Sequence, residues 1–321
     1  MVTCGRCKSR SFIPADLAPF ATTPCSKCGH LVMLPVMLRN FELQTIIASG
    51  GMGTVYTAQD VKLQRQVALK MMKREMAADP AILKAFYREA RAAACLNHTN
   101  IIHIYSFDEF EDQPYLVMEL ADQGSLDSRI EAETRVPELD VLDAGIKMCS
   151  ALTTALRHKL LHRDIKPGNI LYNADGEPKL IDFGLVRASE DDTWEEHIWG
   201  TVYYVAPEKL ERKGEDFHSD MYSLGGTLYH ALTGHVPFEG TVDEVVSAHV
   251  HTALTPPILV APDITELTSN ALLQAMAKNP AERFETYDDF RMALEAARSQ
   301  VLVGQVRQTG QSEPGKSWWR R

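Results

Sequence analysis

The polar stretch His162-Arg163-Asp164-Ile165-Lys166-Pro167-Gly168-Asn169 lies between the apolar pairs Leu160-Leu161 and Ile170-Leu171. The Asp164 carboxylate is suited to accept a proton from an attacking hydroxyl, and the Asn169 amide oxygen is suited to bind a hard cation such as Mg²⁺. The ammonium of Lys166 can offset negative charge that builds on a transferred phosphoryl group. The stretch therefore predicts a catalytic loop, and the alternative is a solvated turn that ends a helix.

Four further motifs surround this loop. Two precede it, Ala48-Ser49-Gly50-Gly51-Met52-Gly53-Thr54-Val55 and Val67-Ala68-Leu69-Lys70, and two follow it, Asp182-Phe183-Gly184 and Ala206-Pro207-Glu208. A glycine-rich turn lets backbone N–H groups approach phosphates, and a lysine among apolar strand residues needs an anionic partner to remain charged. In this order the five motifs resemble those of the protein kinase family, with Ile165 where its catalytic loop has leucine.

The resemblance covers residues 40–298 and implies an α+β, two-lobed protein kinase fold. A small β-rich lobe would span residues 40–120, a large helical lobe would span residues 121–298, and ATP would bind in the cleft between them. Apolar periodicity predicts strands at residues 101–105 and 115–120. It also predicts helices at residues 81–96, 126–132, 141–158, 219–232, 242–249, 267–277 and 287–297.

The resemblance also implies an activity, namely transfer of the ATP γ-phosphoryl group to Ser or Thr hydroxyls of proteins in signalling, including the protein itself. Lys166 and the stretch from Gly200 to Glu208 are similar to the Ser/Thr branch rather than the Tyr branch. Two motifs most resemble those of bacterial kinases of eukaryotic type, namely Gly50-Gly51-Met52-Gly53 and Ser219-Asp220-Met221-Tyr222. Two scaffold roles follow as well: Asp220 would hold the catalytic loop, and Arg283 would pair with Glu208.

The resemblance implies a role in phosphoryl transfer for each residue that matches a motif of the family. Lys70 would bind the α- and β-phosphates, with Glu89 holding it in place, although Glu89 is alternatively a plain surface residue. Asn169 and Asp182 would bind Mg²⁺ or Mn²⁺. The expected nucleotide pocket consists of Ile47, Ala48, Gly50, Gly51, Gly53, Val55, Ala68, Lys70, Met118, Glu119, Ala121, Leu171 and Asp182. Ala48 replaces the first glycine of the family motif, which puts nucleotide affinity in question.

The segment from Asp182 to Glu208 is polar and contains the expected regulatory hydroxyls Ser189, Thr193 and Thr201. By resemblance, Thr201 bonds to the catalytic Asp and Lys. A phosphate on Thr193 could pair with Arg163 and Arg187. Acidic residues of this segment either stand in for that phosphate or merely solvate the loop; they are Glu190, Asp191, Asp192, Glu195 and Glu196.

The first 36 residues form a separate module in this interpretation. Two C-x2-C pairs, Cys4 with Cys7 and Cys25 with Cys28, are separated by seventeen residues. This spacing predicts a zinc ribbon in which four thiolates bind one structural Zn²⁺, with disulfides or redox thiols as the alternatives. A module of this size buries little core, so the metal would supply most of its folding energy. We expect it to dock a protein partner or to regulate, in preference to binding nucleic acid.

Composition limits the remaining possibilities. The 321 residues are 45% hydrophobic and carry a net charge of −10, which argues against broad nucleic-acid binding. The longest apolar run, residues 31–38, is too short for a membrane span, and the charged N-terminus does not resemble a secretory signal. We therefore expect a soluble cytoplasmic protein with protein substrates and a transient dimer for autophosphorylation.

Two questions stay open from the sequence. Residues 299–321 are polar and are expected to be a disordered tail, whose end, Trp318-Trp319-Arg320-Arg321, either contacts a membrane or partner or simply frays. The main rival to a kinase is a catalytically silent scaffold in which the ribbon is the functional part. The presence of Lys70, Asp164, Asn169 and Asp182 argues against that rival, and only Ala48 favours it.

Overall fold

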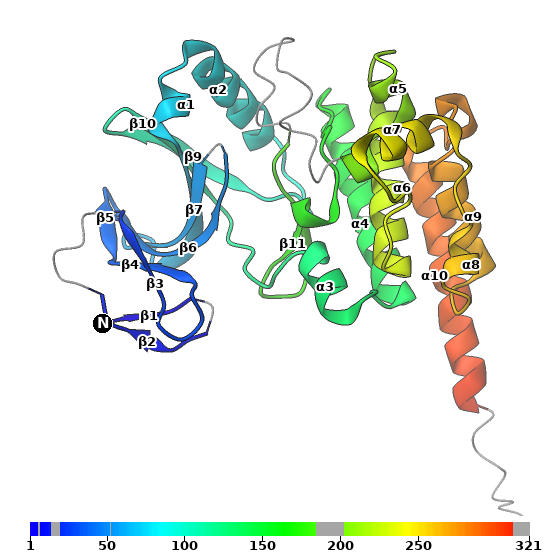
Figure 1. Cartoon of the computed structure of the whole chain (residues 1–321), viewed down its shortest axis with the longest axis horizontal. Helices are drawn as coiled ribbons and strands as arrows, with labels where there is room; N and C mark the ends of the chain where they lie inside the picture. The colour runs from blue at the N-terminus through cyan, green and yellow to red at the C-terminus, as the bar shows by residue number, and fades with distance from the viewer. Residues whose placement is uncertain (6, 14–19, 52, 184–201, 311–321) are drawn as a thin grey trace, which may run out of the picture. The chain divides into compact units, whose positions relative to one another are not determined.

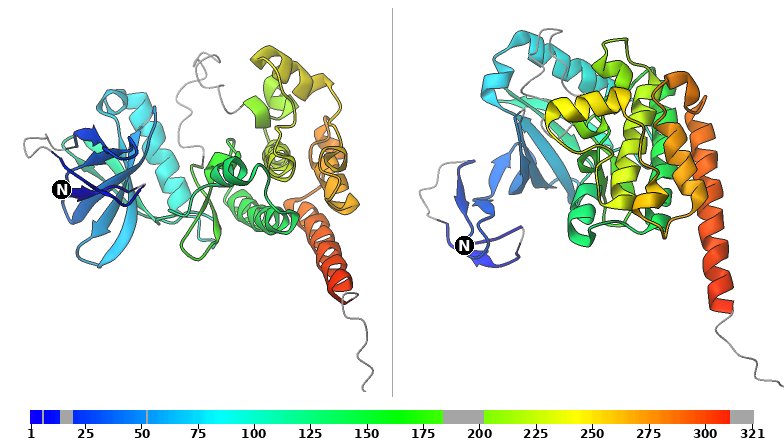
Figure 2. Two further views of the ribbon diagram at one scale, coloured as in Figure 1. Left: turned by 60° about the horizontal axis from the view of Figure 1, so that its bottom comes forward. Right: turned by 45° about the vertical axis from the view of Figure 1, so that its right-hand side comes forward.

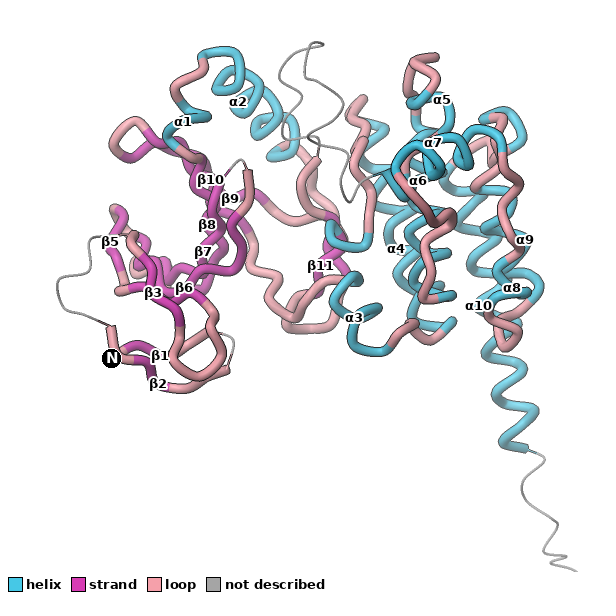
Figure 3. The backbone as a smooth tube through the Cα atoms, in the orientation of Figure 1, coloured by secondary structure: helices cyan, strands magenta, loops and turns pink. Residues whose placement is uncertain are grey.

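The computed structural model describes residues 1–5, 7–13, 20–51, 53–183 and 202–310. These residues form two compact units, one up to Asp122 and one from Gln123 onward. The first unit consists mostly of strands and the second mostly of helices (Figures 1 and 3). This confirms the expected kinase-type division into a β-rich lobe and a helical lobe.

A six-stranded antiparallel sheet, in the order β5-β6-β7-β8-β10-β9, forms the centre of the first unit. The β9–β10 turn places Glu111 and Asp112 at φ of 49° and 60°, as a tight two-residue hairpin requires. For this reason β9 runs on to Phe110 and does not end at Tyr105 as the sequence pattern predicts. The strands are β5 (Val36–Leu38), β6 (Phe41–Ser49), β7 (Gly53–Asp60), β8 (Arg65–Met72), β9 (Ile104–Phe110) and β10 (Gln113–Met118).

The ribbon residues pack against one face of this sheet within the same unit. Two small hairpins precede β5, formed by β1 (Val2–Thr3) with β2 (Arg10–Ser11) and by β3 (Thr22–Pro24) with β4 (Leu31–Met33). Met33 is 1% exposed and belongs to the same apolar cluster as Leu43, Tyr56 and Tyr115 of the sheet. β5 then pairs with β6, so the six-stranded sheet begins directly after these two hairpins.

Helix α2 (Pro80–Ala94) covers the opposite face, after the single turn α1 (Arg74–Ala77). The Asp79 side chain caps α2 by accepting from the backbone N–H of Ala81 at 2.7 Å, and Pro80 occupies the first helical position. Phe86 and Ala90 of α2 pack with Met72 and Leu116 of the sheet. The predicted helix at residues 81–96 is therefore present.

The second unit is a bundle of helices with one small hairpin, β11 (Ile170–Tyr172) with β12 (Pro178–Leu180). Helix α6 is buried on nearly all sides, in keeping with its largely apolar sequence. The helices are α3 (Leu126–Glu133), α4 (Glu138–Arg157), α5 (Pro207–Leu210), α6 (Phe217–Thr233), α7 (Val242–His251), α8 (Pro257–Val260), α9 (Glu266–Ala275) and α10 (Tyr287–Gly310).

Helix α10 corrects the predicted boundary of the tail. The sequence predicts disorder from Ser299, whereas the helix continues to Gly310 and its last turns project beyond the neighbouring helices (Figure 2). Packing against α4 and α9 stabilises α10. Extending a helix that has already formed costs far less free energy than nucleating a new one, so the helix continues beyond the predicted boundary. The Ser299 hydroxyl donates to the Glu295 carbonyl at 2.8 Å. The Trp-Trp-Arg-Arg end lies outside the described residues.

Candidate active site

The predicted catalytic loop connects α4 to β11 and contains one turn of 3-10 helix, Pro167–Asn169. Asn169 is the last residue of this turn, just before β11, and its carbonyl accepts from the backbone N–H of Ile181 at 3.0 Å. This bond fixes the end of the loop to the segment that follows β12. The β11–β12 hairpin therefore brings the backbone of Asn169 close to that of Asp182, although twelve residues separate them in the sequence.

The carboxylate of Asp164 receives two side-chain donors from its own loop. The Lys166 Nζ lies 2.8 Å from Asp164 Oδ2, and the Asn169 Nδ2 donates to the same oxygen at 2.9 Å. Asn169 Nδ2 also donates to the Asp164 carbonyl at 2.7 Å. Because its nitrogen is used in this way, the Asn169 amide has its oxygen directed away from Asp164 as a possible acceptor atom. The structure thus brings together three of the predicted catalytic residues.

Asp220 holds the backbone of the loop, as expected. Its two carboxylate oxygens accept from the backbone N–H of His162 at 2.6 Å and of Arg163 at 2.7 Å. Asp220 is 2% exposed, and this burial raises the pKa of its carboxyl. Arg163 adopts φ of 68°, a left-handed conformation that costs a non-glycine residue energy and persists only where neighbours enforce it.

His162 links the loop to the D-F-G residues. Its Nε2 lies 2.8 Å from the Ile181 carbonyl, and its ring packs edge-on against Phe183 at 4.8 Å between centroids. Asp182, between these two partners, has φ of 56°. Tight packing on both sides thus fixes the backbone that presents the Asp182 carboxylate.

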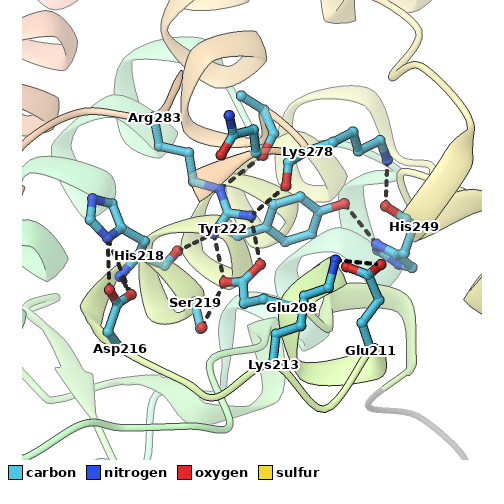
Figure 4. Close-up of polar contacts among 12 residues, drawn as sticks. Glu208, Glu211, Lys213, Asp216, His218, Ser219, Tyr222, His249, Lys278 and Arg283 are labelled. Carbon is cyan, nitrogen blue, oxygen red and sulfur yellow. Dashed lines mark hydrogen bonds and ion pairs between the residues drawn. The ribbon is translucent and has the colours of Figure 1, made fainter. Parts of the chain in front are cut away.

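Glu208 and Arg283 form a buried ion pair, as the resemblance implied (Figure 4). The Ser219 hydroxyl also donates to Glu208 at 2.7 Å, and Arg283 donates to the His218 carbonyl at 2.8 Å. Burial by itself raises the pKa of Glu208, but the hydrogen bonds and charge of Arg283 outweigh it, so the pKa lies below its ordinary value. This pair connects α5 to the chain just before α10.

The first unit places the expected nucleotide-contacting residues on one face of its sheet. Lys70 stands opposite Val55 on β7, and Ala68 stands opposite Met118 on β10. Directly paired residues and alternate residues of a strand share a face, so all four side chains project to the same side. Helix α2 packs on this side too, which is the placement that a Lys70–Glu89 pair requires. The side chain of Glu89 lies outside the described residues.

The glycine-rich turn joins β6 to β7, with Ala48 opposite Val55. A Cβ atom at Gly53 would lie 2.3 Å from the Met71 carbonyl oxygen, whereas one at Gly50 or Gly51 would meet nothing within 4 Å. Gly53 is therefore required by the sheet itself. Gly50 and Gly51 leave the backbone open to a ligand.

The other residues that the sequence analysis expects at the nucleotide belong to the first unit, except Leu171 in the second. Ile47 is 39% exposed on β6, and Ala121 is buried at the end of the first unit. The backbone N–H of Glu119 is already engaged, since it donates to the His103 carbonyl at 2.8 Å. Leu171 belongs to β11 in the second unit. The three regulatory hydroxyls, Ser189, Thr193 and Thr201, lie outside the described residues, as do Arg187 and the acidic residues around them.

The four predicted zinc ligands converge at one point. The Sγ atoms of Cys4, Cys7, Cys25 and Cys28 all lie within 4.8 Å of one another. Cys4 and Cys28 are separated by 3.6 Å and Cys7 and Cys25 by 3.7 Å, distances well beyond a disulfide bond. Four sulfurs at about 2.3 Å from a tetrahedral zinc ion would lie about 3.8 Å apart, so the thiol set fits this metal.

A buried hydroxyl supports the thiol cluster. Ser11 is 2% exposed, and its hydroxyl donates to Cys25 Sγ at 3.1 Å. This hydrogen bond is the main reason why the pKa of Cys25 lies below its ordinary value, whereas burial and the neighbouring thiols raise the pKa of Cys28. Sequence reasoning missed Ser11, because alternate polar residues in a short strand are too common to be a signal.

Two further functional candidates escaped the sequence analysis. Lys209 donates to the Arg163 carbonyl at 3.0 Å, and Glu215 contacts both Arg163 and Lys209. The glutamate belongs to a charged loop, residues 211–216, whose composition indicates only solvation. Its partners lie far from it in the chain, so only the folded structure identifies it.

The fold and this constellation of residues match a known family. The protein kinase domain model matches residues 41–291, and the chain belongs to that family. Members of this family use ATP with a divalent metal ion. Among the described residues, no helix is both long enough and apolar enough to span a membrane.

The relatives are bacterial Ser/Thr kinases. The chain is 36% identical over 270 residues to the serine/threonine-protein kinase PknB of Mycobacterium leprae, a match that covers 81% of this chain and 43% of that protein. It is 33% identical over 294 residues to PknE of Mycobacterium tuberculosis, covering 87% and 52% respectively. The chain thus spans about half the length of these relatives.

A solved structure shows the same fold. The crystal structure of the Mycobacterium tuberculosis PknI kinase domain superposes with a TM-score of 0.64 and 25% sequence identity. The alignment covers 82% of this chain and 98% of the PknI domain. The expected two-lobed kinase fold is confirmed.

Proposed function

We propose that the chain transfers the γ-phosphoryl group of ATP to Ser or Thr hydroxyls of proteins in signalling, including its own. The observation that carries this proposal is the Asp164 carboxylate, with Lys166 Nζ at 2.8 Å and Asn169 Nδ2 at 2.9 Å. A carboxylate anchored in this way stays oriented, and one fixed ammonium beside it can follow the charge on a transferred phosphoryl group.

Each residue then has a distinct role. Asp164 orients the attacking hydroxyl and accepts its proton, while Lys166 stabilises negative charge on the transferred group. Lys70 binds the α- and β-phosphates, and Glu89 holds Lys70. Val55 and Ala68 form an apolar roof over the adenine, and Leu171 forms the floor. Met118 lies at the back of the nucleotide pocket.

Asn169 and Asp182 are the residues that would hold Mg²⁺ or Mn²⁺. Both offer oxygen atoms, which these hard cations prefer, and the Asn169 amide presents its oxygen because its nitrogen donates to Asp164. The ion neutralises phosphate charge when bound. The protein fixes the two oxygen donors on either side of the β11–β12 hairpin.

The test is transfer of labelled phosphate from ATP with Mg²⁺, both to the protein itself and to a generic basic protein substrate. Incorporation on Ser or Thr is expected for the wild type and is expected to vanish in Asp164→Asn. An absence of incorporation in a protein that still binds nucleotide would reject the proposal and favour a kinase-like scaffold. Mapping the labelled hydroxyls would also test Thr193 as a regulatory site and Ser189 and Thr201 as further sites.

We also propose a structural Zn²⁺ bound by Cys4, Cys7, Cys25 and Cys28. The Sγ separations of 3.6 and 3.7 Å support it, as does the hydrogen bond from Ser11 to Cys25. Free thiols at these positions also support a cytoplasmic location, where disulfides are rare. Metal analysis of the purified protein tests the assignment, and one zinc per chain is expected.

The ribbon is proposed to dock a protein partner or to regulate the kinase. Exposed apolar side chains on it support docking, since Phe12 is 78% exposed and Leu31 is 43% exposed. Autophosphorylation would require two copies to meet, so a transient dimer belongs to the same proposal. Concentration dependence of the rate of autophosphorylation tests that step.

A further inference from the structure

Arg163, the residue just before the catalytic Asp164, is held at its backbone N–H, at its carbonyl and at its side-chain Nε. The Arg163 N–H donates to Asp220 at 2.7 Å, and its carbonyl accepts from Lys209 Nζ at 3.0 Å. Its side chain contacts Glu215, with 3.3 Å between Arg163 Nε and Glu215 Oε2. The strained φ of 68° at Arg163 is maintained by these contacts.

Glu215 joins two of the three contacts. Its other oxygen lies 3.4 Å from Lys209 Nζ, so one carboxylate touches both the side chain of Arg163 and the lysine that binds the Arg163 carbonyl. The Glu215 side chain is 11% exposed and the Lys209 side chain is 17% exposed. Limited contact with water strengthens the Glu215–Lys209 pair, whereas the Arg163 side chain is 48% exposed and its pair with Glu215 is weaker.

Two cations and several carboxylates meet at this point. Arg163 and Lys209 both carry positive charge and converge on one small pocket, which Glu215, Asp220 and Ser219 also line. Asp220 uses its carboxylate oxygens on the two backbone N–H groups of the catalytic loop. Asp220 also attracts Lys209, but loss of the Glu215 charge would remove the carboxylate that contacts both cations, so their mutual repulsion would be less well compensated.

We propose that Glu215 is a positioning residue that fixes Asp164 through Arg163 and Lys209. This inference rests on the proposed kinase activity. It assigns to an acid of the chain the task of neutralising Arg163, which the sequence analysis gave to a phosphate or to the acidic residues between Glu190 and Glu196. In this proposal Glu215 positions the catalytic loop, and no phosphate group needs to pair with Arg163.

The main test is single-turnover phosphoryl transfer by the full chain carrying Glu215→Gln. The rate of transfer is expected to fall about tenfold or more, because small displacements of a catalytic group have large effects on rate. The KM for ATP is expected to stay within about twofold, because the nucleotide residues lie elsewhere. Glu215→Asp keeps the charge and should recover most of the rate.

Glu211→Gln is the matched control. Glu211 precedes Glu215 by four residues, and its partner is the exposed Lys213, at 2.8 Å. This variant is expected to keep the wild-type rate. Lys209→Met should lower the rate, and the double variant with Glu215→Gln should lose less than the product of the two single losses, because the residues act as a pair.

Three results would overturn the proposal. The first is a transfer rate of Glu215→Gln within about twofold of the wild-type rate. The second is a rate for Glu215→Asp as low as that of Glu215→Gln, with the loss of rate in parallel with a loss of thermal stability. The third is that the effects of Lys209→Met and Glu215→Gln on the rate are independent. Amide hydrogen exchange at residues 162–166 gives a readout without activity, and faster exchange is expected in Glu215→Gln. Absence of transfer by the wild type would count against the proposed function, while that exchange would still decide the role of Glu215.

Discussion

Arg283 and Glu208 meet through two parallel hydrogen bonds of 2.8 Å each, between Nη1 and Oε1 and between Nη2 and Oε2. They lie 75 positions apart in the chain, and the side chains of Arg283 and Glu208 are 0% and 9% exposed, respectively. A bidentate pair with this little solvent contact holds α5, which follows the segment from Asp182, to the chain just before α10. The pair is strong only while both partners remain charged.

The first prediction concerns this pair. Glu208→Gln should lower the free energy of unfolding at pH 7 by on the order of 3 kcal/mol, because it leaves a buried guanidinium uncompensated. The pKa of Glu208 is lower in the folded protein than its ordinary value of 4.5. Its contribution is therefore complete above about pH 4.5 and is lost as the pH falls through the lower folded pKa.

Urea denaturation of both proteins at a series of pH values measures this. The difference between wild type and Glu208→Gln should be constant near neutrality and shrink below about pH 4.5. Glu211→Gln, which removes an exposed pair with Lys213, serves as the control and should change stability by less than about 0.5 kcal/mol. A difference that grows with acidification would contradict the assignment.

A second prediction concerns the anchor of the catalytic loop. Asp220→Asn replaces an oxygen that accepts from a backbone N–H by an NH₂ group, so one buried donor of His162 or Arg163 loses its partner. The expected cost is about 1–3 kcal/mol in stability, together with a fall of tenfold or more in phosphoryl transfer. Thermal melting and the kinase assay test both, with the exposed Asp175→Asn as control. Retention of full activity would show that the loop does not depend on Asp220.

The third prediction separates the glycines. Gly53→Ala should destabilise the first unit by on the order of 1–3 kcal/mol, because its Cβ would lie 2.3 Å from the Met71 carbonyl oxygen. Gly50→Ala should be within about 0.5 kcal/mol of wild type, since its Cβ meets nothing within 4 Å. Chemical denaturation of the two variants is the measurement. Equal stabilities would mean that β8 yields readily at this point.

The fourth prediction is for the proposed zinc. Removal of the metal with a chelator should lower the melting temperature of the first unit by on the order of 5 °C or more, and added zinc should restore it. The effect should reach the kinase sheet, because Met33 shares the apolar cluster of Leu43 and Tyr115. Cys25→Ser should reproduce the loss, while Cys95→Ser, at an exposed position, should not. A melting curve unaffected by chelation and by Cys25→Ser would argue against a structural metal.

Much of the fold follows from the sequence. The ordered motifs identify the family, and the helix positions agree to within a few residues for α2, α4 and α6. The sequence pattern ends β9 at Tyr105, five residues too early, because the tight turn has its positive φ values at Glu111 and Asp112, where no glycine indicates a two-residue hairpin. Assignment of the individual catalytic, nucleotide-binding and regulatory residues stays a prediction, as does the domain boundary between residues 36 and 40.

The sequence by itself determined the chemistry that lies within short segments. Asp164, Lys166 and Asn169 come from one loop, and the four cysteines come from two tight turns, so local spacing is enough to bring their atoms together. Only the tertiary structure decided which distant side chains support these segments. Glu215 contacts Arg163 across 52 residues of chain, and Met33 joins the kinase core from the ribbon. The physical reason is that such contacts depend on burial and charge in the folded protein, which leave no periodic pattern in the chain.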